Sequence, residues 1–325
     1  MNKNMRKMLG LAATAALAAG VVACGDDETT ASGGGANGGG SDQALSGKIA
    51  IDGSSTVFPF VQAAAELFNE ENPDVKISVG QSGTGGGFEK FCAGETDISD
   101  ASRAIEDDES KACQGKSISY SEVQIANDGI AVVTNKDLKV DNLTTDQLKE
   151  VWNKGSKVDS LSQVDSSLPG EKLSLYGPGT DSGTFDFFTD KINGEEGVTR
   201  EDYEASEDDN QLVTGVSQDK GGLGYFGFSY YEANQDKLNL VGVCDGGGDC
   251  VKPSSQTIQD GTYKPLSRPL FMYPSAKAME RPEVKAFMDF ILANQEAIAK
   301  AANIVPLTGE QASAAQDALK KAEGA

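Results

Sequence analysis

One local pattern recurs along the chain: a short apolar segment typical of a strand, a loop of small polar residues, and a segment with helical periodicity. Segments 48–52, 75–79 and 173–176 have the strand pattern, and each runs directly into such a loop. Strands that alternate with helices are typical of α/β domains, whose strands pair largely in parallel. We therefore predict an α/β fold in which most neighbouring strands are parallel.

The same periodicities predict further elements. Strands are expected over 97–101, 130–134 and 238–243, and helices over 57–69, 88–93, 144–152 and 283–302, with two more helices that begin at residues 182 and 308. Thr144 with Gln147, and Thr308 with Gln311, fit capping boxes, in which each side chain bonds the backbone N–H of the other residue. No internal repeat is visible.

Four polar loops follow strand patterns. They read DGSSTV at 52–57, GQSGTGGG at 80–87, SDASR at 99–103 and YGPGTDSGT at 176–184. Helix N-termini expose unpaired N–H groups, Gly lets the backbone approach a ligand, and Ser and Thr add hydroxyl donors. One such loop alone is most often a cap or a turn, but several in one chain predict a site for a tetrahedral oxyanion. None matches a P-loop, a dinucleotide fingerprint or a GxSxG nucleophile elbow.

The composition excludes several kinds of chemistry. The chain has no His, which excludes a Ser-His-Asp or Cys-His catalytic unit and a His-ligated metal. Its 50 Asp and Glu against 28 Lys and Arg give a net charge of −22, so we expect no nucleic-acid partner, since phosphate backbones are held by clustered basic residues. No metal and no cofactor are predicted.

The N-terminus has the pattern of an export signal. Positive residues at 3, 6 and 7 precede a short apolar run over 9–22, which is too short to span a membrane. The run ends in Ala23-Cys24, which resembles the lipobox of bacterial lipoproteins. We predict a signal peptide over 1–23, a lipidated Cys24, a flexible Gly/Ser/Asp linker over 24–44, and attachment to the outer face of the cell membrane. An ordinary signal peptide with a chance Cys is the alternative.

The other four cysteines are Cys92, Cys113, Cys244 and Cys250. An exported chain favours disulfides over free thiols. Four cysteines allow three connectivities, of which Cys92–Cys113 with Cys244–Cys250 is the most economical.

Six segments occur in the order IDGSSTVFPF, VGQSGTGGGFEKF, DISDASRAI, LYGPGTDSGTFDFF, GGLGYFGFSYY and KPLSRPLFMYP. This combination resembles the phosphate-binding proteins of ABC transporters, from about Lys48 to the C-terminus. The resemblance implies a class II periplasmic-binding-protein fold, in which two crossing strands join two α/β lobes around a ligand cleft. By this analogy the crossings lie near 126–129 and 264–271, lobe one comprises 45–126 with 268–325, and lobe two comprises 127–267.

The resemblance also implies which residues surround the ligand. The positions that match its loops are Ser55, Thr56, the Val57 amide, Thr84, Ser102, Arg103, Asp181, Ser182, Gly183 and Thr184. Many relatives have an Arg shortly before the Ser-Gly-Thr motif, where this chain has Pro178. We therefore expect Arg103 to supply the bidentate cationic contact. The alternative for Arg103 is a surface ion pair with Glu106 or Asp107.

Many relatives also place a carboxylate at the fourth loop to accept the proton of hydrogen phosphate, and this chain has Ser102-Arg103 there. Asp181 is our first candidate for that acceptor and Asp100 our second. A charge near a helix cap is an equally open interpretation of Asp181.

The implied function is the capture of inorganic phosphate outside the membrane, by a monomer, and its delivery to an ABC transporter permease, without covalent chemistry. A binder of sulfate, molybdate or phosphonate is the nearest alternative, and a carboxylate acceptor would discriminate against fully ionised sulfate. An exported phosphatase is less favoured, because it would need metal ligands or an activated nucleophile.

Overall fold

The computed structural model describes residues 44–323. The predicted signal peptide, Cys24 and the linker as far as residue 43 lie outside the described residues.

The strands belong to one mixed sheet. They are β1 (Gly47–Gly53), β2 (Val75–Val79), β3 (Ile98–Ala101), β4 (Val123–Asn135), β5 (Asn142–Thr144), β6 (Ser174–Gly177), β7 (Glu204–Ala205), β8 (Gly222–Gly227), β9 (Leu238–Cys244), β10 (Cys250–Val251) and β11 (Ser267–Pro274). The main path of the sheet is β2-β1-β3-β11-β4-β8-β6-β7, and β9 pairs with β4, β5 and β10.

The helices are α1 (Phe58–Glu71), α2 (Gly83–Ala93), α3 (Asp107–Gly115), α4 (Thr145–Trp152), α5 (Gly183–Phe188), α6 (Asp209–Gln218), α7 (Phe228–Glu232), α8 (Ser255–Gln259), α9 (Ala276–Met279), α10 (Pro282–Ala293), α11 (Gln295–Ala301) and α12 (Gly309–Glu323). Both predicted capping boxes are present, at the start of α4 and at Thr308 with Gln311. The predicted helix over 283–302 is wrong in one respect, because it is broken at Asn294. Asn294 leaves the helical conformation, with φ −116° and ψ 15°, and its side-chain amide donates to the carbonyl of Phe290 at 2.9 Å.

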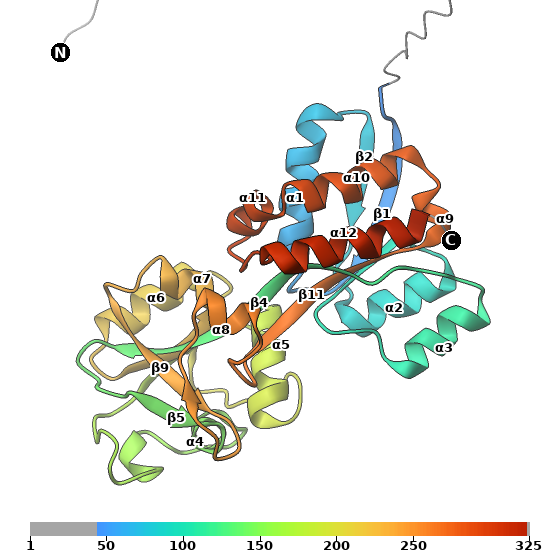
Figure 1. The fold of residues 1–325 in the computed structure, drawn as a ribbon. Coiled ribbons are helices and arrows are strands. Elements are labelled where there is room, and N and C mark those ends of the chain that lie inside the picture. The colour runs from blue at the N-terminus through green and yellow to red at the C-terminus, as the bar shows by residue number, and fades with distance from the viewer. Residues whose placement is uncertain (1–43, 324–325) are drawn as a thin grey trace, which may run out of the picture. The chain divides into compact units, whose positions relative to one another are not determined.

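Our expectation of mostly parallel pairing is wrong. β1 is parallel to β2 and β3, and β6 is parallel to β7 and β8. By contrast, β4 is antiparallel to β8, β9 and β11, and β11 is antiparallel to β3 as well. The reason is topological: β4 carries the chain from one part of the sheet to the other and β11 carries it back, as Figure 1 shows.

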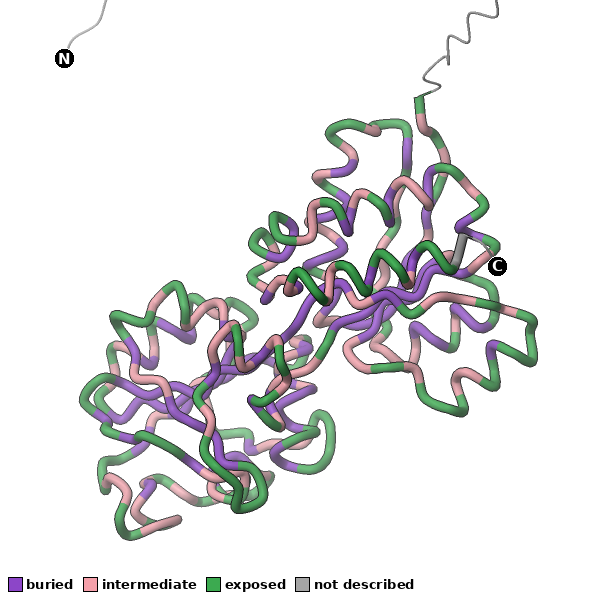
Figure 2. The backbone as a smooth tube through the Cα atoms, viewed as in Figure 1, coloured by how far each residue is buried: buried purple, intermediate pink, exposed green. Residues whose placement is uncertain are grey.

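The apolar side chains form two main cores, one on each side of this crossing. The first includes Ile49, Phe60 and Phe287, and we call the part of the molecule around it lobe one. The second includes Val132, Trp152 and Tyr225, and we call the part around it lobe two. Figure 2 shows that β4 is buried along most of its length, where it contributes to both. The predicted limits of each lobe along the chain stay a prediction.

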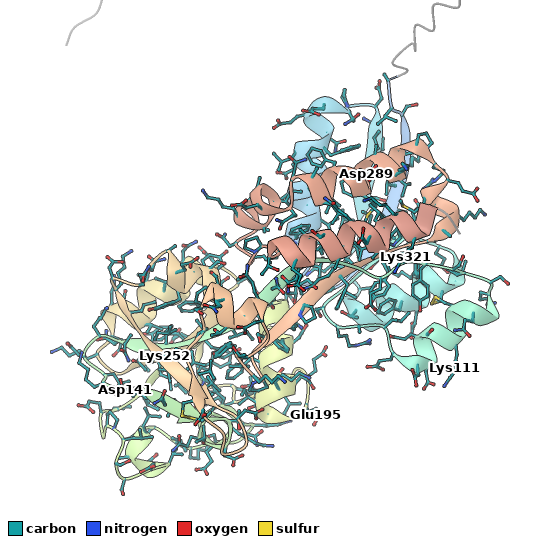
Figure 3. All side chains as sticks on the ribbon, viewed as in Figure 1. Lys111, Asp141, Glu195, Lys252, Asp289 and Lys321 are labelled. Carbon is teal, nitrogen blue, oxygen red and sulfur yellow. A yellow bond between two sulfur atoms is a disulfide. The ribbon has the colours of Figure 1, made fainter. Side chains whose placement is uncertain are left out.

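Two disulfides join Cys92 to Cys113 and Cys244 to Cys250, which confirms the most economical of the three connectivities. The first ties α2 to α3, and the second closes the turn between β9 and β10. Figure 3 draws the side chains of the described residues, and among the charged ones that it labels, Lys111, Asp141, Glu195 and Lys252 are exposed.

Candidate anion-binding site

A cleft of about 810 Å³ is lined by residues of both lobes and of β11. Of the ten predicted ligand positions, six line it: Ser55, Thr56, Thr84, Ser102, Arg103 and Gly183. The other four, Val57, Asp181, Ser182 and Thr184, do not belong to its lining. The structure therefore brings one position or more from each of the four predicted loops to a single place.

The first loop turns where β1 ends, and Ser54 holds the turn. Its carbonyl accepts the N–H groups of Val57 and Phe58 at 3.2 and 3.0 Å, and its Oγ accepts the Thr56 N–H at 3.2 Å. The Val57 amide is thus already bonded within the loop. The Ser55 N–H has no acceptor among the described residues. Besides its two hydroxyls, this loop therefore offers one free amide to a ligand.

The second loop is anchored to the end of β1 by Asp52. The Asp52 carboxylate accepts the Ser82 N–H at 3.0 Å, the Ser82 hydroxyl at 2.5 Å and the Lys90 ammonium at 2.6 Å. Burial raises the pKa of Asp52, but the bonds from Lys90 and Ser82 outweigh burial and hold the pKa below its usual value. A charged Asp52 therefore fixes the position at which α2 begins.

The N-terminus of α2 presents a further set of donors. The N–H groups of Gly83, Thr84 and Gly85 bond to no acceptor in the described part of the chain. The Thr84 hydroxyl lies 3.2 Å from the Ser102 hydroxyl and accepts the Ser102 N–H at 3.2 Å. The second and fourth predicted loops thus meet directly, beside a helix N-terminus that carries partial positive charge.

The third loop brings lobe two against the first loop. Ser182 caps α5 by accepting the Thr184 N–H at 3.2 Å. A methyl group at Gly183 would lie 2.1 Å from Thr56 Oγ1 and 2.6 Å from the Thr56 backbone nitrogen. Because no side chain fits in that space, Gly183 is required for the observed approach of α5 to the first loop.

Arg103 lines the cleft with its guanidinium committed to neighbours. Its two terminal nitrogens donate to the two carboxylate oxygens of Glu109 at 2.8 Å each, and Nε lies 3.4 Å from Glu106. These bonds raise the pKa of Arg103 above its ordinary value. Its role as the cationic ligand stays a prediction. The contact with Glu106 is one of the two ion pairs that the alternative interpretation names.

Arg268, on β11, is a site residue that our sequence analysis missed. Its Nη2 donates to Thr56 Oγ1 at 2.6 Å and to the Gly183 carbonyl at 3.1 Å, and its Nε donates to Asp128 at 3.2 Å. The guanidinium carbon lies 3.9 Å from the centre of the Phe187 ring. The available signal is a single Arg in the apolar strand segment LSRPLF, within the motif KPLSRPLFMYP.

The two candidate proton acceptors lie outside the cleft lining. Asp181 is exposed, and its N–H donates to Glu207 at 3.3 Å. Asp100 is fully buried beneath the first loop, and neither of its carboxylate oxygens has a partner among the described residues. Burial raises the pKa of Asp100 well above its ordinary value, which favours the neutral acid.

Asp186, on α5, is a carboxylate that does line the cleft. Burial and the neighbouring charge of Glu196 raise its pKa to about 6, although Arg268 acts in the opposite direction. Asp186 is therefore ionised at neutral pH but takes a proton more readily than an ordinary aspartate. We did not predict it, because a single Asp in a short helix pattern carries no signal of its own.

Within residues 44–323, no group of three or more Cys, Asp or Glu is arranged to hold a metal ion. Each helix within the same residues is too short or too polar to cross a membrane.

Comparisons with known proteins show the family to which the chain belongs. A family model described as a PBP superfamily domain matches residues 36–295. Protein SphX of Synechococcus elongatus is 46% identical over 269 residues, which are 82% of this chain and 80% of that protein. Phosphate-binding protein PstS of Staphylococcus saprophyticus is 41% identical over 263 residues, or 80% of this chain and 81% of that protein.

A solved structure extends the likeness to three dimensions. The crystal structure of a possible phosphate binding protein from Planctomyces limnophilus matches with a TM-score of 0.81 and 42% identity, over 86% of this chain and 99% of that chain. The α/β fold is therefore that of periplasmic binding proteins, as predicted. The chain belongs to the PBP superfamily and, within it, to the family that includes the phosphate-binding PstS proteins.

Proposed function

We propose that this protein binds inorganic phosphate outside the cell membrane and delivers it to an ABC transporter permease. The observation that carries the proposal is the meeting of the polar loops in one cleft. Neutral donors from the first loop, from Thr84 with Ser102, and from the free amides of α2 line it together with cationic side chains. Such a set stabilises a tetrahedral oxyanion without a metal ion.

The proposed mechanism is capture between the lobes. Gly183 of lobe two lies against Thr56 of lobe one, so an anion held by the first loop also faces the start of α5. A ligand that contacts both lobes stabilises the conformation in which they are close, and so favours closure. A permease that recognises the closed form would then receive the loaded protein.

We further propose that Asp186 discriminates phosphate from sulfate. Hydrogen phosphate carries a proton that it can donate to an ionised carboxylate, whereas fully ionised sulfate has none and would be repelled. Asp186 lines the cleft and is ionised at pH 7. It replaces Asp181 and Asp100 as our first candidate for the acceptor, because neither of those belongs to the lining.

The placement of the protein in the cell is part of the proposal. The N-terminal pattern that ends at Cys24 supports export and a lipid anchor on the outer face of the membrane, and the linker would then tether a monomeric binding domain. Binding without covalent chemistry is part of the same proposal, and a chain without His cannot form a Ser-His-Asp or Cys-His unit.

Calorimetric titration of the full chain tests the proposal. We expect phosphate to bind at least about 100-fold more tightly than sulfate at pH 7. Asp186→Asn should lower the ratio of phosphate affinity to sulfate affinity, chiefly by allowing sulfate to bind. Asp181→Asn, on an exposed residue of the loop that precedes α5, is the matched control and should leave the ratio unchanged. Equal binding of the two anions by the unaltered chain would refute the phosphate assignment.

A further inference from the structure

The cleft has three cations in its lining: Arg103, Lys191 and Arg268. Arg103 gives both arms of its fork to Glu109, and Lys191 bonds the adjacent Asp190 at 2.8 Å. Both of these cations are substantially exposed, at 38% and 45% of their side chains, while Arg268 is 12% exposed. The contact of a desolvated cation with an anion is stronger than the same contact in water.

The surroundings of Arg268 hold its guanidinium in one orientation. Asp128, on β4, accepts from Nε, and the Phe187 ring of lobe two lies against the guanidinium. Nη2 faces Thr56 and Gly183, which are predicted ligand positions of lobe one and lobe two. No described residue accepts a hydrogen bond from Nη1. A fixed fork with one unused arm is preorganised for an oxyanion.

We propose that Arg268 is the cationic ligand of the bound phosphate and that it couples the anion to closure of the lobes. This inference rests on the proposed function. The phosphate oxygens accept hydrogen bonds from Nη1 and share with Thr56 and Gly183 those from Nη2, while Asp128 keeps its bond from Nε. Because β11 is one of the two strands that cross between the lobes, the anion is held at the hinge as well as by each lobe.

The geometry also explains how the cleft binds an anion inside so acidic a protein. Asp128 neutralises Arg268 in the formal sense, so the anion meets an oriented ion pair and neutral donors, and the Asp186 carboxylate in the same lining accepts its proton. Distant surface carboxylates act through water and are screened beyond about 10 Å at moderate ionic strength. The fork of Arg268 acts at contact range and is not screened in this way.

The test compares matched variants of the two arginines, in the full chain, by calorimetric titration with inorganic phosphate. Arg268→Lys keeps the charge but loses the fork, and we expect it to weaken binding roughly 10-fold or more. Arg268→Gln should weaken binding roughly 100-fold or more. Arg103→Gln and Arg103→Lys test the competing assignment, because Arg103 also lines the cleft. Each should change the affinity by less than about 3-fold, and a larger loss than in the Arg268 variants would overturn the inference. Circular dichroism of each variant without phosphate reports whether it is folded.

The outcomes are distinguishable. If the unaltered chain does not bind phosphate, the proposed function fails and takes this inference with it. If the unaltered chain binds and folded Arg268→Gln binds equally well, the inference alone is overturned. If both Arg268 variants unfold, a crystal structure of the unaltered chain with phosphate decides: Nη1 or Nη2 of Arg268 within about 3.2 Å of a phosphate oxygen supports the inference, and a phosphate held by Arg103 overturns it.

Discussion

Arg103 and Arg268 line the same cleft but stand in different surroundings. The Arg103 side chain is 38% exposed and meets Glu106 and Glu109, of which Glu106 is 66% exposed. The Arg268 side chain is 12% exposed and meets Asp128, which is 10% exposed. Exposed ion pairs contribute at most about 1 kcal/mol, whereas removal of one partner of a buried pair costs several. More carboxylates surround Arg103, yet burial makes the single partner of Arg268 the more consequential one.

The largest effect on stability should come from Asp128→Asn. This change leaves a desolvated guanidinium without its counter-charge, and we expect it to lower the free energy of unfolding by about 3 kcal/mol. Urea denaturation of the full chain measures the change. A loss smaller than about 1 kcal/mol would mean that water or Phe187 compensates Arg268, and that the two arginines are more alike than their burial suggests.

Gly183→Ala should have the next largest effect, on binding more than on stability. The new methyl group would lie 2.1 Å from Thr56 Oγ1, so α5 and the first loop must move apart at the place where Arg268 bonds both. We expect the phosphate affinity to fall roughly 10- to 100-fold, in line with the cost of overpacking.

Gly115→Ala is the matched control for this substitution. Gly115, at the end of α3, does not belong to the cleft lining, and a methyl group there meets nothing within 4 Å. The affinity measured by calorimetry should stay within about 2-fold of the parent value, since no contact is disturbed. An equal loss in the two variants would show that the close approach at Gly183 has no special role.

The polar loops and the surroundings of Arg268 differ in how far the sequence predicts them. The loops that precede helices were recognisable because Gly, Ser and Thr at a strand-to-helix junction have a local physical meaning, and Thr84 and Ser102 indeed meet. Arg268 has no such signature. Its environment is made by Asp128, Thr56 and Gly183, which are 140, 212 and 85 residues away along the chain.

The same contrast applies to the direction of strand pairing and to the choice of proton acceptor. The pairing direction of β4 and β11 depends on how the chain crosses between the lobes, which no local periodicity records. Asp181 was favoured as a proton acceptor for its place in the loop, but α5 begins so that Asp186 lines the cleft and Asp181 stays exposed. Local patterns predict the hydrogen-bond donors of the cleft, whereas the charged residues that line it with them depend on the tertiary fold.

Asp186→Asn should produce a smaller, pH-dependent effect on stability. The folded protein holds the pKa of Asp186 at about 6, against 3.8 ordinarily, so it binds the proton more tightly than the unfolded chain does. Stability therefore falls as the pH rises from about 4 to about 6 and stays reduced above that range. The variant lacks this penalty because it carries no ionisable group there.

Thermal unfolding of parent and variant at pH 4 and pH 7 measures the difference. We expect Asp186→Asn to be the more stable of the two at pH 7 and to lose that advantage at pH 4. The charges of Glu196 and Glu207 oppose the ionisation of Asp186, whereas the charge of Arg268 favours it. If the variant is less stable than the parent at pH 7, attraction to Arg268 stabilises ionised Asp186 by more than burial destabilises it. Asp186 would then belong to the same ion-pair network as Arg268 and Asp128.

The smallest effect should come from Glu109→Gln, which removes the main counter-charge of Arg103. The pair is partly exposed, so we expect a loss of at most about 1 kcal/mol in urea denaturation. Glu109 also accepts the Glu106 N–H at 2.8 Å, a cap that a Gln oxygen can keep. Phosphate affinity should stay within about 2-fold of the parent value.

Glu109→Gln combined with Arg268→Lys tests whether Arg103 can replace Arg268 as the phosphate ligand. Without Glu109 the fork of Arg103 has no bidentate partner and is free to turn toward an anion. We propose that orientation by Asp128 and burial beside Phe187 make Arg268 the phosphate ligand. Arg103 has neither, so releasing it from Glu109 should restore little of the lost phosphate affinity. The double variant should therefore bind phosphate as weakly as Arg268→Lys alone. Recovery to within about 3-fold of the parent affinity would contradict this, because it would show that either arginine suffices once its fork is released and that burial is not the deciding difference between them.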